Sequence, residues 1–446
     1  MGNGEMKLNR YPKYKPTGIA WLPELPEGWE VVRLGVLGSL SNGLSKGGES
    51  FGTGFPFVAY GDVYRDSALP MMVKGLVQST LAEQKACSVL RGDVFFTRTS
   101  ESIEEIGFSS VCLSDLDKAT FAGFLIRFRP RGNELMPEFS RFYFRNFRLR
   151  AYFQLRISGL ITRASLSQSV LRDLPVLLPP LPTQRAIVAF LDGKCGKIDR
   201  WVAAKEREVA LLKELKQAMI AEAVTGATHV APTDTARKMK PSGISWLPEV
   251  PEGWEVKRLK GLFSLRRESY SPNEQLQVLS LIKDVGVIPY EEKGQLGNKS
   301  KEDILGYNVA RKGDIVMNSM NVIIGSVDIT PFDGYISPAY YALTARQGVE
   351  PKYFNYLFHL TLVQKMMRSL AKGILEIRLR ISITSLLGMS FPVPPLAEQR
   401  AIVAYIEARA AKIDAAVAGL EREVAAMKEY KQRLIADVVT GQRKVA

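Results

Sequence analysis

The stretch Pro179–Asp199 reads PPLPTQRAIVAFLDGKCGKID, and a second stretch, Pro394–Asp414, reads PPLAEQRAIVAYIEARAAKID. The similarity continues to Gly226 and Gly441, so that 28 of 48 aligned residues are identical at a constant offset of 215. Each stretch begins with two prolines, which end the preceding element and are tolerated in the first turn of a helix. Each ends at Thr-Gly, where glycine suits the left-handed residue that follows a helix. The repeat therefore predicts two long helices that end at these glycines.

Apolar side chains recur in both predicted helices at alternating steps of three and four residues. This period of 3.5 residues is typical of a left-handed coiled coil, in which one apolar seam packs against another helix. The predicted seam consists of Ile198, Val202, Val209, Leu212 and Met219 in the first helix and of Ile413, Val417, Leu420, Val424, Met427 and Leu434 in the second. We expect the two helices to pair with each other as an antiparallel coiled coil and to act as a rigid spacer.

A second repeat precedes each variable stretch of the chain. Pro16–Leu34 (PTGIAWLPELPEGWEVVRL) and Pro241–Leu259 (PSGISWLPEVPEGWEVKRL) agree at 15 of 19 positions. The residues between the matched segments diverge, so we interpret the chain as two copies of one unit, an internal two-fold pseudo-repeat. The expected segments are residues 1–178 (leading segment and first globular domain), 179–226 (first spacer helix), 227–240 (polar linker), 241–393 (second leading segment and globular domain) and 394–446 (second spacer helix).

Both globular domains contain short β-rich runs bounded by Gly, Pro and Asp, followed by one helical run. Such a mixture predicts an α+β (mixed α/β) fold in which each globular domain is followed by its long helix. The predicted strands are Phe57–Ala59, Gly92–Phe96, Phe124–Phe128, Val278–Ile282, Gly313–Met317 and Tyr340–Leu343, and the predicted late helices are Pro137–Leu155 and Pro351–Leu370.

The composition favours a protein that meets a polyanion. The chain has 446 residues, enough for two or more domains, and a formal net charge of +14 at pH 7. Strongly basic proteins often bind nucleic acid. Three widely separated cysteines indicate neither a disulfide framework nor a zinc site. Since no apolar run approaches the roughly 20 residues of a membrane span, and MGNGEMKLNRYPKYK has no apolar secretion signal, we expect a cytoplasmic protein without membrane contact.

Arginines alternate with aromatic residues in Phe139–Arg156 (FSRFYFRNFRLRAYFQLR). The fork of an arginine suits phosphates and guanine edges, so we expect these arginines to contact DNA and the aromatic residues to form core. Polar loops that follow predicted strands suit the same role, and Arg98 and Thr99 align with Asn318 and Ser319 between the two halves. The predicted DNA-contacting residues are Lys46, Arg98, Thr99, Arg141, Arg145, Arg148, Arg150, Arg163, Arg266, Arg267, Asn318, Ser319, Asn321, Lys365, Arg368, Lys372 and Arg378.

Motifs for catalysis are nearly absent from the sequence. It has no GxxxxGK[ST] phosphate loop, no glycine-rich dinucleotide fingerprint after a strand, and only two histidines. We therefore expect no catalytic residue, no metal site and no directly bound cofactor. One alternative is a Mg²⁺-dependent nuclease that uses Asp284, Glu291 and Lys293. Another is a helical scaffold or adaptor whose globular domains bind proteins.

Together these features resemble the specificity subunit of type I restriction–modification systems. The resemblance covers essentially the whole chain and rests on PPLPTQRAIVAFLD…KID and PPLAEQRAIVAYIE…KID, on LPELPEGWEVVRL and LPEVPEGWEVKRL, and on Arg311–Asn318 and Asp333–Tyr341. It implies that each globular domain reads one half of a split, asymmetric DNA sequence while the paired helices set the unread gap.

The same resemblance implies partners that carry the chemistry. Two methyltransferase subunits would dock on the chain, bring S-adenosylmethionine and methylate an adenine at N6 after flipping it out of double-stranded DNA. Restriction subunits, where present, would add translocation and cleavage that depend on ATP and Mg²⁺. The specificity subunit of this family contributes no catalytic residue.

Overall fold

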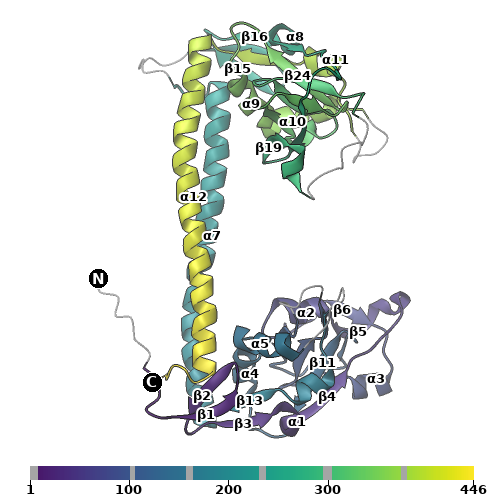
Figure 1. The fold of residues 1–446 in the computed structure, drawn as a ribbon, viewed down its shortest axis with the longest axis vertical. Helices are drawn as coiled ribbons and strands as arrows, with labels where there is room; N and C mark the ends of the chain where they lie inside the picture. The colour runs from purple at the N-terminus through teal and green to yellow at the C-terminus, as the bar shows by residue number, and fades with distance from the viewer. Residues whose placement is uncertain are drawn as a thin grey trace. The chain divides into compact units, whose positions relative to one another are not determined.

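The computed structural model describes residues 9–100, 106–156, 164–230, 238–294, 304–372 and 379–445. The chain forms two compact units: residues 1–206 with 421–446, and residues 207–420. The two long helices, α7 (Leu181–Thr225) and α12 (Leu396–Val439), contribute residues to both units (Figure 1). Each unit thus combines one globular domain with the first part of its own helix and the last part of the other helix. The linear segment boundaries expected from the sequence stay predictions.

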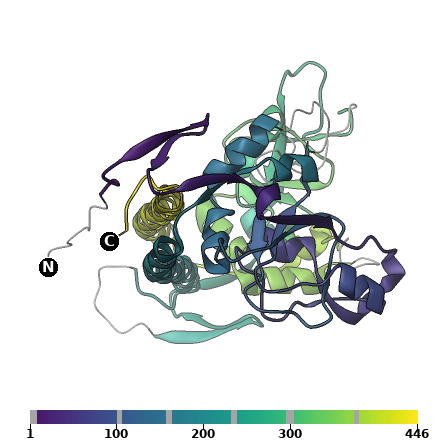
Figure 2. The ribbon, with the colours of Figure 1, turned by 90° about the horizontal axis from the view of Figure 1, so that it is seen from below.

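The leading hairpin of the first unit closes on the end of α12 (Figure 2). The hydroxyl of Tyr14 donates a hydrogen bond to the carbonyl oxygen of Gly441, 2.8 Å away. Gly441 has φ 73°, and a Cβ atom there would lie 2.5 Å from Pro26 Cδ and 3.3 Å from the ring of Trp29. Both the helix end and the close approach of the hairpin therefore require glycine at this position. The hairpin consists of β1 (Tyr14–Ile19) and β2 (Leu22–Pro26).

The second unit repeats this closure with the end of α7. Gly226 has φ 80°, and a Cβ atom there would lie 2.6 Å from Pro251 Cδ and 3.1 Å from the ring of Trp254. The second hairpin consists of β14 (Met239–Ile244) and β15 (Leu247–Pro251). The repeated segments Pro16–Leu34 and Pro241–Leu259 therefore each pack on the end of the long helix that belongs to the other copy. This common contact explains why the two segments match so closely.

A four-stranded antiparallel sheet of order β4-β11-β7-β9 forms the centre of the first globular domain. A smaller sheet of order β10-β5-β6 adjoins it, and the pairs β3-β13 and β8-β12 complete the strands. The strands are β3 (Glu30–Arg33), β4 (Gly38–Asn42), β5 (Phe51–Val58), β6 (Gly75–Val77), β7 (Val94–Thr97), β8 (Thr99–Ser100), β9 (Ser109–Val111), β10 (Thr120–Phe121), β11 (Leu125–Pro130), β12 (Ala164–Ser165) and β13 (Pro175–Leu178). The helices are α1 (Leu34–Leu37), η1 (Gly48–Ser50), α2 (Tyr60–Arg65), α3 (Leu81–Ala86), α4 (Pro137–Tyr143), α5 (Phe147–Arg156) and α6 (Gln168–Arg172).

The second globular domain has the matching antiparallel sheet, of order β17-β24-β21-β22, and a second sheet of order β19-β18-β23-β20. The strands are β16 (Glu255–Arg258), β17 (Phe263–Leu265), β18 (Gln277–Ile282), β19 (Gly286–Pro289), β20 (Asn308–Ala310), β21 (Ile315–Asn318), β22 (Val327–Ile329), β23 (Gly334–Ile336), β24 (Tyr340–Ala345) and β25 (Ser390–Val393). The helices are α8 (Leu259–Leu262), η3 (Tyr290–Lys293), η4 (Val322–Ile324), α9 (Pro351–His359), α10 (Thr361–Leu370) and α11 (Ile383–Gly388). The predicted α+β fold is confirmed, and all six predicted strands overlap observed ones.

The late helix of each domain is broken in two, where the sequence analysis predicted one. In the first domain Asn146 separates α4 from α5: its side-chain oxygen accepts hydrogen bonds from the N–H groups of Arg148 (3.0 Å) and Leu149 (3.4 Å). That geometry is an N-cap, which starts a new helix. In the second domain Leu360 adopts an extended conformation, with ψ 132°, between α9 and α10.

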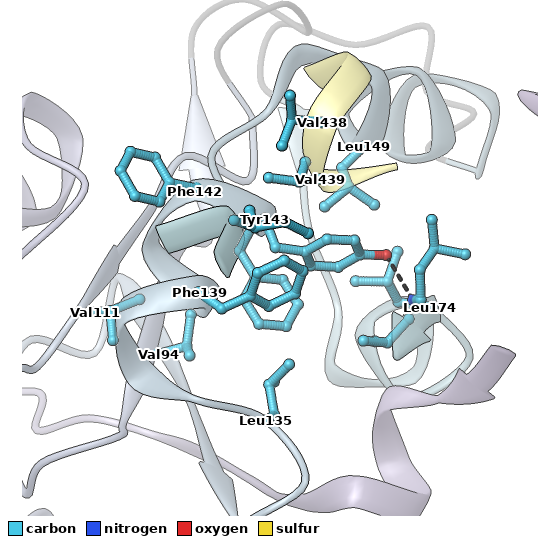
Figure 3. Close-up of a cluster of buried hydrophobic side chains, with 14 of the residues drawn as sticks. Val94, Val111, Leu135, Phe139, Phe142, Tyr143, Leu149, Leu174, Val438 and Val439 are labelled. Atoms are coloured by element: carbon cyan, nitrogen blue, oxygen red, sulfur yellow. Dashed lines mark hydrogen bonds between the residues drawn. The ribbon is translucent and has the colours of Figure 1, made fainter. Parts of the chain in front are cut away.

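The core of the first domain joins aromatic residues of α4 to the end of α12 (Figure 3). Phe139 and Tyr143 are fully buried in the same cluster as Val438 and Val439, and the Tyr143 hydroxyl accepts a hydrogen bond from the N–H of Leu177 (2.9 Å). Each such side chain contributes roughly 1.5–3 kcal/mol on burial. The prediction that the aromatic residues form core is confirmed for four of the five phenylalanines in this stretch and wrong for the fifth. Phe139, Phe142, Phe144 and Phe153 are buried, and Phe147 is exposed.

A buried glutamine anchors the start of each long helix. The side chain of Gln184 accepts a hydrogen bond from the N–H of Met136 (2.9 Å) and donates to the carbonyl oxygens of Glu134 and Pro179. Gln399 makes the same three bonds, from the N–H of Glu350 and to the carbonyl oxygens of Gly348 and Pro394. Both glutamines have no exposed surface. The Gln of the repeated PPL-x-x-Q motif is therefore a structural tie between the helix and the loop before the late helix.

The two long helices pair in antiparallel directions, as predicted. In the first unit, Lys431 contacts Asp199 (2.6 Å) and Lys428 contacts Glu206 (2.8 Å). The residue number therefore increases along α7 where it decreases along α12, as in an antiparallel pair. In the second unit Lys216 contacts Asp414 at 2.7 Å. The predicted seam is buried at Ile198, Val202, Met219, Val417, Val424 and Leu434 and half-buried at Val209, Leu212, Ile413, Leu420 and Met427.

Candidate nucleic-acid interface

A buried aspartate fixes the start of the central strand of the first domain. Asp93, which precedes β7, accepts hydrogen bonds from the N–H of Leu90 (2.9 Å) and from two guanidinium nitrogens of Arg129 (both 2.6 Å). Its side chain has no exposed surface. Hydrogen bonding to Asp93 raises the pKa of the Arg129 guanidinium, so Arg129 stays protonated.

The second domain uses the equivalent aspartate with a different arginine. Asp314 accepts hydrogen bonds from the N–H of Arg311 (2.9 Å) and the hydroxyl of Thr344 (2.8 Å), and it is ion-paired with Arg266. Arg266 also contacts Glu268. The aspartate of the Gly-Asp motif therefore has a structural role in both domains, because it holds the start of the central strand in place. The other end of the strand is then fixed relative to the domain.

The opposite ends of the two central strands have the same backbone hydrogen bonds. In the first domain the N–H of Arg98 donates to the carbonyl oxygen of Phe124 (2.9 Å), and the carbonyl oxygen of Arg98 accepts from the N–H of Leu166 (2.7 Å). This shared arrangement holds three chain segments together at one edge of the sheet. We call it the strand-end frame.

The frame of the second domain is built from Ser319, Ala339 and Ile381. The N–H of Ser319 donates to Ala339, and its carbonyl oxygen accepts from Ile381, both at 3.0 Å. Ser319 is therefore the structural equivalent of Arg98. The alignment that paired Arg98 with Asn318 was wrong by one residue, and counting from the Gly-Asp motifs at Gly92 and Gly313 gives the pairing that the hydrogen bonds show.

Several predicted residues meet at the first strand-end frame. Thr99 follows Arg98 directly, and its carbonyl oxygen accepts a hydrogen bond from the Tyr60 hydroxyl (3.0 Å). Lys46 lies in the loop after Leu44, whose backbone is bonded to Gly123, and forms a 2.6 Å ion pair with Glu83. Across the part of the chain that the structure describes, the Arg98 guanidinium has no hydrogen bond or ion pair.

The second strand-end frame gathers other polar residues. Asn318 is buried and its side-chain oxygen accepts a hydrogen bond from the N–H of Met320 (3.1 Å), so it shapes the loop. Asn321 is exposed beside it. Ser319 is fully buried, and its hydroxyl has no partner among the described residues. Lys372 is exposed and forms a backbone bridge with Arg380, next to Ile381.

The arginines of α4, of α5 and of the turn between them brace the first domain. Arg145 donates four hydrogen bonds of 2.6–3.2 Å, all to backbone carbonyl oxygens, and its guanidinium lies 4.5 Å from the ring centre of Phe108. Arg141 is ion-paired with Asp192, and Arg148 with Asp437 at 2.6 Å. The guanidinium of Arg145, through four hydrogen bonds, and one guanidinium nitrogen each of Arg141 and Arg148 are therefore engaged by the protein itself, which makes these three residues weaker candidates for DNA contact than the sequence suggested. The four carbonyl oxygens bound by Arg145 belong to Val63, Tyr64, Arg65 and Ser109.

Arg150 and Arg266 are also held within the protein. Arg150 lies 5.0 Å from the ring centre of Phe108, and burial lowers the pKa of its guanidinium. Arg266 is engaged by Asp314 and Glu268. The sequence could not reveal most of these partners, because they are distant along the chain: Asp314 is 48 residues from Arg266, and Asp437 is 289 residues from Arg148.

The remaining predicted cations are exposed or lie outside the described residues. Arg267 is exposed next to Arg266, and Lys365 and Arg368 are exposed on α10, whose buried side is formed by Val363 and Met367. Arg163 and Arg378 fall outside the described residues.

The nuclease alternative gains no support from the geometry. Asp284 occupies the turn between β18 and β19, with φ 62°. Lys293 is buried, with its ammonium group 4.5 Å from the ring centre of Tyr290. Over the ranges that the structure describes, no group of three or more His, Cys, Asp or Glu residues is placed to hold a metal ion. Nor does any helix within those ranges combine the length and the apolar character that crossing a bilayer requires.

Sequence reasoning missed one exposed residue at the first frame. Phe124 was expected to begin a strand, yet β11 begins at Leu125 and the Phe124 side chain is 66% exposed. The stretch Phe124–Phe128 contains no signal that separates an exposed first residue from a buried one, because the position of Phe124 is fixed by backbone hydrogen bonds of Gly123 with Leu44 and of Phe124 with Arg98.

Comparisons with known proteins agree with this architecture. A family model described as the type I restriction modification DNA specificity domain matches residues 26–198 and again residues 251–422. The putative type I restriction enzyme MjaX specificity subunit of Methanocaldococcus jannaschii is 23% identical over 99% of both chains. The type I restriction enzyme EcoBI specificity subunit of Escherichia coli is 26% identical over 63% of this chain and 61% of its own length.

Solved structures share the fold. A chain from a study of complex assembly and conformational transition of the type I R-M system aligns with a TM-score of 0.66 and 19% identity, over 94% of this chain and 99% of that one. The HsdS subunit from Thermoanaerobacter tengcongensis aligns with a TM-score of 0.50 and 19% identity, over 94% and 98% of the two chains.

Proposed function

The chain belongs to the type I restriction–modification DNA specificity family, and on that premise we propose that each of its globular domains reads one half of a bipartite, asymmetric DNA site. The observation that carries the proposal is the strand-end frame, which occurs twice with different side chains. Equal frames give both domains the same way of meeting the duplex, and unequal side chains give them different half-sites. The paired helices α7 and α12 set the length of the unread gap.

We propose that DNA contacts come from half-buried residues at and near the first frame and from exposed residues at and near the second. In the first domain these are Lys46, Arg98 and Thr99. In the second domain they are Arg267, Asn321 and Lys372, with Lys365 and Arg368 of α10 as phosphate contacts. Arg163 and Arg378 remain proposed contacts on the sequence alone. Asn318 and Ser319 act by shaping the loop that carries Asn321, because their side chains are buried.

The chemistry is proposed to reside in partner subunits. Two methyltransferase subunits would bind the chain and use S-adenosylmethionine to methylate adenine at N6, and restriction subunits would supply cleavage that depends on ATP and Mg²⁺. The specificity chain itself contributes recognition, and the complex would act on DNA in the cytoplasm.

The decisive experiment is genome-wide mapping of N6-methyladenine in cells that express the methyltransferase subunits with and without this chain. We expect one bipartite motif that appears only when the chain is present. Binding of the purified complex to that motif should weaken steeply as salt rises, because phosphate contacts release counterions. Methylation that is independent of the chain, or DNA binding that ignores salt, would contradict the proposal and favour an adaptor role.

A further inference from the structure

The side chain of Phe124 is exposed although its backbone is rigidly held. Its carbonyl oxygen accepts the hydrogen bond from Arg98, and the preceding N–H, of Gly123, donates to Leu44 at 2.7 Å. The ring is 66% exposed, whereas Phe121 and Phe128 nearby in the sequence have no exposed surface. An aromatic ring in water forgoes the gain of burial, so a ring fixed in that position is suited to a partner that covers it.

The immediate surroundings of Phe124 are rich in hydrogen-bond donors. Arg98 lies on the same frame, with a guanidinium that no described residue engages. Gln168 and Asn42 are joined side chain to side chain at 3.0 Å, two residues beyond Leu166 and two before Leu44. An apolar ring and a guanidinium on one frame, with amides on the adjoining segments, match the edges of DNA bases, which present acceptors, donors and thymine methyl groups in the major groove.

The second domain lacks this ring. Its frame has Ala339 in the place of Phe124 and Ser319 in the place of Arg98. A methyl group cannot reach where a phenyl ring reaches, so the two frames present different chemistry from the same backbone position.

We propose that Phe124 is a specificity-determining residue of the first domain, where its ring makes an apolar contact with the bases of one half-site. The proposal rests on the proposed function, since it assumes that the first frame faces DNA. The ring meets either a thymine methyl group or the faces of a base step that it partly opens, and both are apolar contacts with bases.

The test uses the full chain with its methyltransferase subunits and a duplex that carries the mapped motif. Phe124→Ala should weaken binding about four-fold, because it removes an apolar contact equivalent to about one methylene group. It should also relax the methylation preference at one position of one half-site and leave the other half-site unchanged. Phe147→Ala is the matched control, since Phe147 is also exposed but lies on α5, away from the frame.

Two DNA substitutions identify the contact. Replacing single thymines by uracil removes only the methyl group, and one such duplex should lose affinity for the wild-type complex but not for Phe124→Ala. If no uracil has that effect, 2-aminopurine placed along the half-site should brighten with the wild-type complex and not with the variant, which would indicate an opened base step. Either result supports the proposal.

Three results would overturn the inference. The first is unchanged affinity and motif in Phe124→Ala. The second is an equal effect of Phe147→Ala. The third is loss of methyltransferase subunits on gel filtration with DNA preference intact, which would make the ring a protein contact. If the wild-type complex has no bipartite motif at all, the proposed function fails instead, and the two failures are thereby distinguished.

Discussion

The two globular domains share a frame but are braced to their helices by different charges. The acidic residues Asp192 of α7 and Glu407 of α12 correspond at the offset of 215. Asp192 is ion-paired with Arg141 of α4, whereas Glu407 is ion-paired with Lys352, which lies one turn earlier in α9. Buried amides behave differently, because Gln184 and Gln399 make identical bonds. A surface charge can be replaced by any side chain that reaches, whereas a buried amide must satisfy fixed backbone groups.

The late helices show the same contrast at one more position. Met136 and Glu350 are equivalent, because each donates its N–H to the helix glutamine, and counting onward pairs Arg145 with His359. Arg145 ties four carbonyl oxygens together, whereas His359 is exposed and its ring nitrogen Nδ1 lies 2.8 Å from the carbonyl oxygen of Asn355. The guanidinium of Arg145 therefore holds several backbone segments of the first domain together, and the second domain has no equivalent cation at this position.

The largest effect is expected at the buried aspartates. Asp93→Asn should destabilise the first domain by about 3–4 kcal/mol, because Arg129 would lose its only carboxylate among the described residues. Asp314→Asn should cost about 1 kcal/mol less, since Arg266 keeps Glu268. Hydrogen exchange of amides, resolved by domain, measures both. Equal losses would show that Glu268 does not compensate.

The helix glutamines should behave alike. Gln184→Ala and Gln399→Ala should each cost about 2–3 kcal/mol, because each leaves one N–H and two carbonyl groups buried without partners. Denaturant unfolding, with hydrogen exchange of the backbone amides of each domain as the observable, provides the measurement. A difference above about 1 kcal/mol would mean that the identical bond patterns are not energetically equivalent.

The bracing arginine should matter in one domain only. Arg145→Ala should destabilise the first domain by about 2 kcal/mol, because four carbonyl oxygens lose a donor, whereas His359→Ala should change the second by less than about 0.5 kcal/mol. Affinity for DNA should be unchanged in Arg145→Ala at temperatures where it remains folded, as fluorescence anisotropy would report. A loss of DNA affinity without a loss of stability would indicate that Arg145 contacts DNA.

The smallest effect is expected between the helices. Double-mutant cycles on Lys431–Asp199 and Lys216–Asp414 should each give a coupling of about 0.5 kcal/mol, because the aspartates are exposed and water screens the pairs. The two couplings should agree, since the four residues correspond at the offset of 215. Raising the salt concentration should reduce both equally.

Much of this fold was predictable because its signals are local. Heptad spacing revealed the seam from Ile198 to Leu434, and Pro-Pro and Thr-Gly marked both ends of the long helices. The single late helix was the main error, since the cap that divides it depends on the side-chain orientation of Asn146, which spacing does not encode.

The contact residues were less predictable. Arg141, Arg145 and Arg148 have the right chemistry for phosphate, but composition cannot tell whether a guanidinium meets a phosphate or a carbonyl oxygen of its own chain. Phe124 had the pattern of a buried residue and is exposed.

Periodicity and repetition alone determined that this chain holds two related domains and two paired helices, because regular spacing follows directly from helix geometry. The tertiary structure decided which helix end packs on each hairpin, which arginines bind partners within the protein and which aromatic ring is exposed to solvent. Those outcomes depend on contacts between residues hundreds of positions apart, such as Tyr14 with Gly441, and no local pattern encodes them.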